Sequence, residues 1–287
     1  MARQPGPSVR SRRLVMLLAR LRVDSGLSRA DLAKSVGMSP SKITRIESME
    51  IGIYRHDLLR LLDFYQIAES GRIELLDLLS HAEERGWLRL RGDVDLPDDW
   101  QTWVDFEADA TVILNYEPLR IPGFLQTPDY ARAIIQSTNS DLSDAEVDKL
   151  VTSRIARQVR LSHAHPLKLH AIIEENALTR PFCDTQSQVR QLRHLADFAT
   201  YPNVLIQVLP IGAGLHSALN GSFVILEYGN KTRLVHLEDK VTIVYLDEEE
   251  QIEMYTQTWD ELCALAYNPE KSVDSISAIA AQVDRKN

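Results

Sequence analysis

The sequence has 287 residues, more than the roughly 100–200 of one typical domain, so we expect two domains. Its 44% hydrophobic and 25% charged residues are typical of a globular protein and exclude the disordered, collagen-like and disulfide-scaffold classes. Two cysteines, Cys183 and Cys263, are too few for a disulfide framework, and no segment approaches the roughly 20 apolar residues of a membrane span, so the sequence predicts a cytoplasmic protein with no membrane association.

Charge is distributed unevenly along the chain. The net charge is −9, yet residues 1–55 hold 11 Lys and Arg against 4 Asp and Glu, a net charge of +7. Residues 93–287 hold 16 against 30, a net charge of −14. The basic end favours contact with phosphate, whereas the acidic remainder predicts a part that faces away from nucleic acid and serves dimerisation, sensing or partner binding.

The first 92 residues predict five helices, and no strand is expected before residue 100. The first helix, residues 12–25, has the apolar spacing of one buried helix face, at Leu14, Leu17, Leu18 and Leu21. Further helices are expected at residues 28–35, 39–48, 56–65 and 71–85, the second and third capped by Ser28 and Ser39. The basic residues 1–13 predict either an arm along the duplex or a solvated tail.

Residues 86–99 mix Gly, Pro and charged residues without a period, and they mark the predicted junction between domain 1–92 and domain 93–287. Beyond them, strands are expected at residues 111–116, 167–173, 204–209, 222–228, 233–237 and 242–246. Gly229 and Asn230 predict a hairpin turn, because both residue types tolerate a positive φ. Helices are expected at residues 128–136, 143–161, 185–200 and 249–267. This pattern predicts an α+β domain with a largely antiparallel sheet.

Residues 29–48 carry the motif that predicts function. Small Ala33 allows two helices to cross closely, and Gly37 makes the tight turn between them. Ile43 and Ile46 then anchor the inner face of the second helix. This spacing resembles the helix-turn-helix of the lambda-repressor-like, xenobiotic-response-element family, and residues 41–47 resemble its recognition helix.

The outer face of this helix supplies the predicted DNA contacts. In such a motif the N-terminal part of the second helix enters the major groove, so Lys42 and Arg45 are the candidates for base edges. Four further candidates suit phosphates: Ser28, Arg29, Ser39 and Thr44. Ser41 also lies on the outer face and is a candidate DNA contact.

The resemblance also implies a structural residue and two departures. Glu47 is expected to hold the bundle together through an internal ion pair rather than to touch a base. Arg29 stands where relatives usually carry Gln, and Met49 where many carry a helix-ending Gly. Contact preference and the end of the recognition helix therefore stay open.

The second domain carries its own signature. Residues 115–131 (NYEPLRIPGFLQTPDYA) hold a Pro122-Gly123 turn, then Thr127 as a helix cap with Pro128 at the first helical position. They closely resemble the opening of a domain appended to helix-turn-helix regulators in actinomycetes, with further matches at residues 154–158, 169–181, 191–195, 203–210 and 212–223. The relatives are called antitoxin-like regulators and are often encoded beside a small acidic protein, which implies a possible partner.

No catalytic or metal site is predicted in this domain. His163, His165 and His170 stand near Glu174 and Glu175, but no ligand set has the spacing of a zinc site. The sequence contains no phosphate loop and no nucleophile elbow, so we expect no enzyme activity, no cofactor and no metal.

Four residues at strand ends or turns are candidates for a ligand pocket: Glu175, Arg180, His216 and Asn220. Structural pairing among them explains the same pattern equally well.

Together these features predict a transcriptional regulator with an all-α N-terminal bundle and an α+β C-terminal domain. The expected partners are double-stranded DNA, a second copy of the chain, and a small acidic protein or a small-molecule effector. A homodimer on a pseudo-palindromic operator is expected, because one module alone buries only about 600–1,000 Å² of protein surface. The alternative is an antitoxin-like protein that sequesters a small protein partner, with DNA binding as autoregulation.

Overall fold

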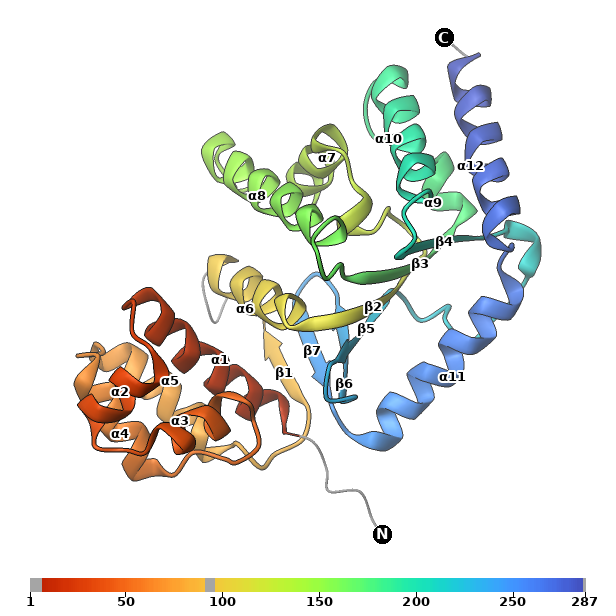
Figure 1. Cartoon of the computed structure of the whole chain (residues 1–287). Coiled ribbons are helices and arrows are strands. Elements are labelled where there is room, and N and C mark those ends of the chain that lie inside the picture. Colours follow the sequence, from red (N-terminus) through yellow and green to blue (C-terminus); the bar gives the residue numbers. More distant parts are fainter. Residues whose placement is uncertain (1–6, 91–95, 286–287) are drawn as a thin grey trace. The chain divides into compact units, whose positions relative to one another are not determined.

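The computed structural model describes residues 7–90 and 96–285 (Figure 1). The chain forms two compact units. The first contains Met1–Asp109 together with Asp239–Glu249, and the second contains Ala110–Glu238 together with Glu250–Asn287.

The five predicted N-terminal helices are confirmed. They are α1 (Val9–Asp24), α2 (Arg29–Val36), α3 (Pro40–Glu47), α4 (Arg55–Phe64) and α5 (Glu69–Ser80). Their apolar faces share one core, in which Leu14, Ala33 and Leu58 are each at most 1% exposed. Because burial of this kind contributes roughly 25 cal/mol per Å² of apolar surface, the shared core holds together helices too short to be stable alone.

The start of α1 differs from the predicted arm or tail. The helix begins at Val9, with the Ser8 side chain as its cap, and both Arg12 and Arg13 are only 5% exposed. Arg13 forms an ion pair with Asp105, so its charge is neutralised within the first unit. The prediction is therefore wrong for residues 9–13, while residues 1–6 lie outside the described part.

The first unit also contains β1 (Trp87–Leu90), α6 (Leu96–Ala108) and β7 (Thr242–Leu246). Strand β1 pairs antiparallel with β7, which places Trp87 opposite Tyr245. The expectation of no strand before residue 100 was wrong, because four residues show no alternation without their distant partner. The pairing also joins residues 239–249 to the first unit, which is therefore built from two separate stretches of the chain.

In the second unit the strands follow the order β6-β5-β2-β3-β4. They are β2 (Ala110–Glu117), β3 (Lys168–Glu174), β4 (Val204–Leu209), β5 (Phe223–Tyr228) and β6 (Arg233–Glu238). Strand β3 runs parallel to β2 and β4, whereas the β2–β5 and β5–β6 pairs are antiparallel. The predicted all-α bundle followed by an α+β domain is thus confirmed, with a mixed sheet.

The β5–β6 hairpin forms where it was predicted, with different turn chemistry. The positive φ, 63°, belongs to Lys231 rather than to Gly229 or Asn230. The Lys231 N–H donates to the Tyr228 carbonyl at 2.8 Å, which closes the turn.

Helices complete the second unit (Figure 1). They are α7 (Pro128–Thr138), α8 (Asp144–Ala156), α9 (Glu175–Thr179), α10 (Thr185–Phe198), α11 (Glu249–Leu265) and α12 (Pro269–Asp284), with 3-10 turns at Gly123–Leu125, Arg157–Leu161 and Ile211–Ala213. Helix α7 packs on α8, and α12 packs on both α10 and β4. Among the described residues, no helix combines the length and apolar character that a membrane crossing requires.

Candidate nucleic-acid interface

Short polar residues and one glycine set the ends of α2 and α3. The Ser28 hydroxyl accepts from the Asp31 N–H at 3.1 Å, and the Ser39 hydroxyl accepts from the Lys42 N–H at 3.2 Å. Gly37 ends α2 with φ +69°, a left-handed conformation that glycine adopts without strain. Pro40 occupies the first position of α3, where no N–H is needed. The helix-turn-helix geometry therefore follows from local chemistry.

Helix α3 buries one face and leaves the other free. Ile43 and Ile46 are each 3% exposed and belong to the core of the bundle. Ser41, Thr44 and Arg45 are exposed. The Thr44 hydroxyl donates to the Pro40 carbonyl at 3.0 Å, so its proton is used within the helix. An exposed polar face on the second helix of the motif is the arrangement that reads a major groove.

Glu47 braces the bundle, as the resemblance implied. Its carboxylate accepts from Arg22 Nε at 2.6 Å and from Arg29 Nε at 2.6 Å. Burial by itself raises the pKa of Glu47, but the hydrogen bonds and the positive charges of the two arginines together outweigh burial and hold the pKa below its ordinary value. Arg29, a candidate phosphate contact, is thus already paired with Glu47.

The two basic side chains of α3 are paired as well. Lys42 Nζ lies 2.5 Å from Asp57 Oδ2, and Arg45 Nε lies 3.0 Å from Glu50 Oε1. Asp57 is only 1% exposed, whereas Glu50 is 61% exposed. Arg45 is therefore easily released by solvent or by a phosphate, but Lys42 is held by a buried carboxylate.

Sequence reasoning missed three exposed residues where α4 begins. The rings of Tyr54 and His56 stack with centroids 5.7 Å apart and an interplanar angle of 14°. Arg55, which lies between these two residues in the sequence, is also exposed. Their place beside Lys42 and Asp57 depends on the α3–α4 connection, which has no periodicity to predict it. A Tyr-Arg-His run at a helix start is nevertheless a recognisable polar signal for phosphate binding.

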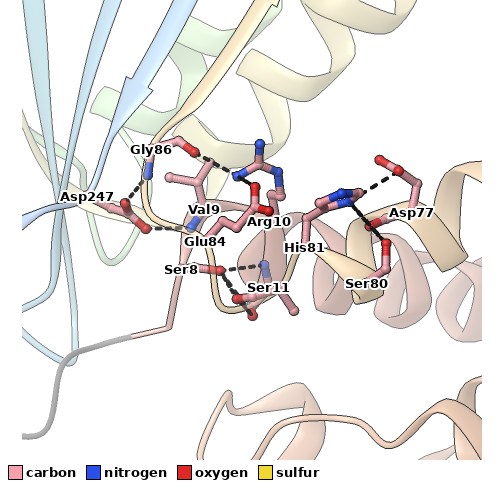
Figure 2. A network of polar contacts seen from close by, with 11 residues as sticks. Ser8, Val9, Arg10, Ser11, Asp77, Ser80, His81, Glu84, Gly86 and Asp247 are labelled. Carbon is pink, nitrogen blue, oxygen red and sulfur yellow. Dashed lines mark hydrogen bonds and ion pairs between the residues drawn. The ribbon is translucent and has the colours of Figure 1, made fainter.

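The start of α1 is fixed by a distant carboxylate (Figure 2). Asp247 accepts from the Val9 N–H at 2.8 Å and from the Gly86 N–H at 2.6 Å. Beside it, Arg10 donates to the Gly86 carbonyl at 2.8 Å and approaches Glu84 at 3.4 Å. Asp247 directly follows β7. Its hydrogen bonds therefore attach residues 239–249 to the unit that carries the helix-turn-helix.

In the second unit, three glutamines fix the segment that carries the signature. The Gln126 amide donates to the Ile121 carbonyl at 2.7 Å, and Gln158 donates to the Gln126 carbonyl at 2.6 Å. Gln191, 1% exposed, donates to the Leu125 carbonyl at 2.7 Å and accepts from the Thr127 N–H at 2.7 Å. The dispersed sequence matches therefore meet in space as one polar lock on the main chain.

A family model described as a domain of unknown function, DUF5753, matches residues 100–278. The chain belongs to the DUF5753 family. A second model, described as a helix-turn-helix domain, matches residues 13–75. No curated protein matches the chain.

Two solved structures show weak likeness to this DUF5753 chain. Nuc, a phospholipase D family member from Salmonella typhimurium, has 7% identity and a TM-score of 0.33, covering 64% of this chain and 96% of its own. TrmBL2, an archaeal chromatin protein described with a novel mode of DNA binding, has 12% identity and a TM-score of 0.30, covering 84% and 88%. TM-scores this low support neither a fold nor a function.

The four candidate ligand residues of the DUF5753 part lie in different surroundings. Glu175 accepts from the Ile211 N–H at 3.1 Å, and His216 Nε2 lies 3.4 Å from Glu174 Oε1, so both hold the loop that follows β4. Asn220 is exposed in the same loop. Arg180 instead lines a shallow hollow with Tyr130, Phe182 and Gln188.

A buried polar cluster underlies that loop. The Tyr116 hydroxyl donates to Glu174 Oε1 at 2.5 Å, and burial, followed by this hydrogen bond, raises the pKa of Tyr116. The His216 side chain is 3% exposed. The cluster thus ties the ends of the parallel strands β2 and β3 to the loop.

The three histidines considered as metal ligands have different surroundings. His170 Nε2 is 2.7 Å from Gln207 Oε1, and its ring meets the Trp259 ring edge-on at 4.8 Å. Burial lowers the pKa of His170, against the opposing effect of that hydrogen bond. His163 and His165 are exposed. Across the described ranges, no three His, Cys, Asp or Glu side chains gather as metal ligands do.

Proposed function

We propose that this DUF5753 chain is a cytoplasmic, sequence-specific DNA-binding transcriptional regulator with a lambda-repressor-like helix-turn-helix. The observation that carries the proposal is α3, whose Ile43 and Ile46 are buried while Ser41, Thr44 and Arg45 stay exposed. Arg45 suits the guanine O6 and N7 acceptors in the major groove. The proposal assigns no reaction to the chain.

The chain acts, in this proposal, as a homodimer on a pseudo-palindromic operator. A single module offers too little surface for tight specific binding, so two half-sites about 10–10.5 base pairs apart are expected. The second unit then serves dimerisation and the sensing of a ligand or partner. The distribution of charge supports this division, because residues 1–55 have a net charge of +7 and residues 93–287 a net charge of −14.

Selection of duplexes from a random library by the full chain tests this function. We expect enrichment of a two-fold symmetric site, and Arg45→Ala is expected to lower affinity for that site by about 1–3 kcal/mol. Arg193→Ala is the matched control, since Arg193 is 67% exposed on α10 of the second unit and is expected to leave affinity unchanged. Failure to enrich any sequence contradicts the proposal.

A second candidate function, sequestration of a small protein partner, is favoured by one observation. The loop after β4 exposes Ile211 by 63%, Leu215 by 90% and Leu219 by 57%. Glu175, Glu174 and Glu261 hold this loop in place, the last by accepting from the Ser217 hydroxyl at 2.5 Å. Apolar side chains presented on a fixed loop are typical of protein contacts.

Co-expression with any small acidic protein that is found encoded beside the gene tests the second function. Co-purification with the wild-type chain and its loss in Leu215→Asp are expected. Val241→Asp is the control, because Val241 is 60% exposed elsewhere in the chain. Equal recovery by both variants contradicts a docking role for the loop.

A further inference from the structure

Lys42, a basic residue of the recognition helix, lies against a buried carboxylate. Its Nζ is 2.5 Å from Asp57 Oδ2, with the lysine side chain 30% exposed and the aspartate side chain 1% exposed. The ammonium group also lies 5.7 Å from the centre of the Tyr54 ring, which supplies a weak cation–π contact. Lys42 is thus partly covered by α4 and by an aromatic side chain.

Asp57 depends on this lysine. On its other oxygen, Oδ1, it is approached by His56 Nε2 at 3.3 Å. Within the described part of the chain, no hydrogen-bond donor of good geometry meets Oδ2, so the nearby ammonium group is what offsets its charge. Removing one partner of a buried ion pair is far more costly than losing an exposed ion pair. Transfer of Lys42 to a DNA phosphate would therefore leave the buried Asp57 carboxylate without its counter-charge.

Arg45 offers the contrast on the same helix. Its partner Glu50 is 61% exposed, and Arg45 itself is 48% exposed, so little is lost when Arg45 turns to a phosphate or a base. The two basic residues of α3 have equal formal charge, but only Arg45 can leave its carboxylate partner for DNA at little cost.

We propose that Asp57 is a positioning residue of the DNA interface, which withholds Lys42 from the duplex. This inference rests on the proposed DNA-binding function. The lysine neutralises Asp57 and adds no phosphate contact, so reading by α3 falls to Arg45, Ser41 and Thr44. The sequence-based assignment of Lys42 to a base edge is replaced, in this proposal, by a role inside the protein.

The test is the salt dependence of binding by the full chain to a 30-base-pair duplex of mixed sequence. The logarithm of the association constant falls with the logarithm of salt concentration by about 0.9 for each phosphate neutralised. Lys42→Met is expected to leave this slope unchanged. Asp57→Asn is expected to steepen it by about one, because the freed lysine then reaches a phosphate, and the Lys42→Met, Asp57→Asn double variant is expected to return it to the wild-type value.

A slope that falls by about one in Lys42→Met, or that stays unchanged in Asp57→Asn, overturns the inference. If Lys42→Met fails to fold, Asp57→Asn and the double variant decide, since neither leaves an unpaired buried charge. A wild-type chain that binds no duplex at low salt overturns the proposed function itself. The two failures are thus distinguishable.

Discussion

The helical bundle and the second unit satisfy their buried polar groups by different chemistry. In the bundle, carboxylates meet cations: Glu47 holds Arg22 and Arg29, and Asp57 holds Lys42. The second unit also pairs the buried Glu117 with Arg120 at 3.3 Å, but here neutral amides that bind the main chain hold the connecting segments. Gln191 bridges Leu125 and Thr127, and the Asn203 amide donates to the carbonyls of Leu161 and Leu167 at 3.0 and 2.8 Å.

This difference means that the bundle and the second unit respond differently to salt. Ion pairs near a surface respond to pH, salt and competing phosphates, so a DNA-binding face built on them keeps some cations available and reserves others. Amide–backbone bonds carry no net charge and respond little to salt. The +7 net charge of residues 1–55 already counts Glu47, but it does not count Asp57 and Asp105, which neutralise Lys42 and Arg13; it therefore overstates the charge offered to DNA.

The largest effect on stability is expected where the hydrogen bonds of an uncharged amide, Gln191, are removed. Gln191→Leu leaves the Leu125 carbonyl and the Thr127 N–H without their partner, and we expect a loss of about 3 kcal/mol in the free energy of unfolding. Urea denaturation at low and high salt measures it, with Gln257→Leu on the exposed face of α11 as the control. A loss that shrinks strongly with salt contradicts an uncharged role for Gln191.

Next in size is the carboxylate that braces the bundle. Glu47→Gln is expected to cost about 2 kcal/mol at pH 7, because Arg22 and Arg29 lose their shared counter-charge. Glu50→Gln, at an exposed pair, is the control and is expected to cost under about 0.5 kcal/mol.

The pH dependence of this brace has a definite sign. The pKa of Glu47 lies below 4.5 in the folded chain, so its stabilisation is present above that pH and is lost as pH falls through the folded pKa. The gap between wild type and Glu47→Gln is expected to stay constant from pH 7 to about 5 and to narrow below about 4.5. Urea unfolding across this range checks it, and a constant gap down to pH 3 contradicts it.

Asp247 combines both chemistries, since a carboxylate binds two main-chain N–H groups. Asp247→Ala is expected to destabilise the first turn of α1 by about 1 kcal/mol. Hydrogen exchange of the Val9 and Gly86 amides measures this, and both are expected to exchange faster. Asp239→Ala, in the turn before β7, is the control, and unchanged protection of Val9 in Asp247→Ala speaks against the contact.

The smallest effect concerns backbone strain alone. Gln66, exposed after α4, has φ +51°, and Met49 after α3 has φ +58°. Gln66→Gly is expected to stabilise the chain by about 0.5 kcal/mol, because glycine adopts this conformation without strain. Met49→Gly is expected to gain less, since Met49 also packs against the core. Thermal unfolding of the two variants decides the order.

The sequence alone determined the helical bundle and its motif. Helix hydrogen bonds join residues four apart, and the caps Ser28, Ser39 and Gly37 act within four residues, so all the needed information is local. Ile43 and Ile46 were placed in the core by spacing alone. Helix α12 was missed although Asn268 and Pro269 give the same cap-and-proline signal used for α3.

Only the tertiary structure decided which distant groups meet. Strand β1 exists through its pairing with β7, more than 150 residues away, and no local pattern encodes that partner. The same holds for the candidate site: that Lys42 faces Asp57, and that Glu175 and His216 share a loop while Arg180 lies elsewhere, depends on how the elements pack. A sequence lists charges, but the energy of each charge depends on its burial and its neighbour, and folding sets both.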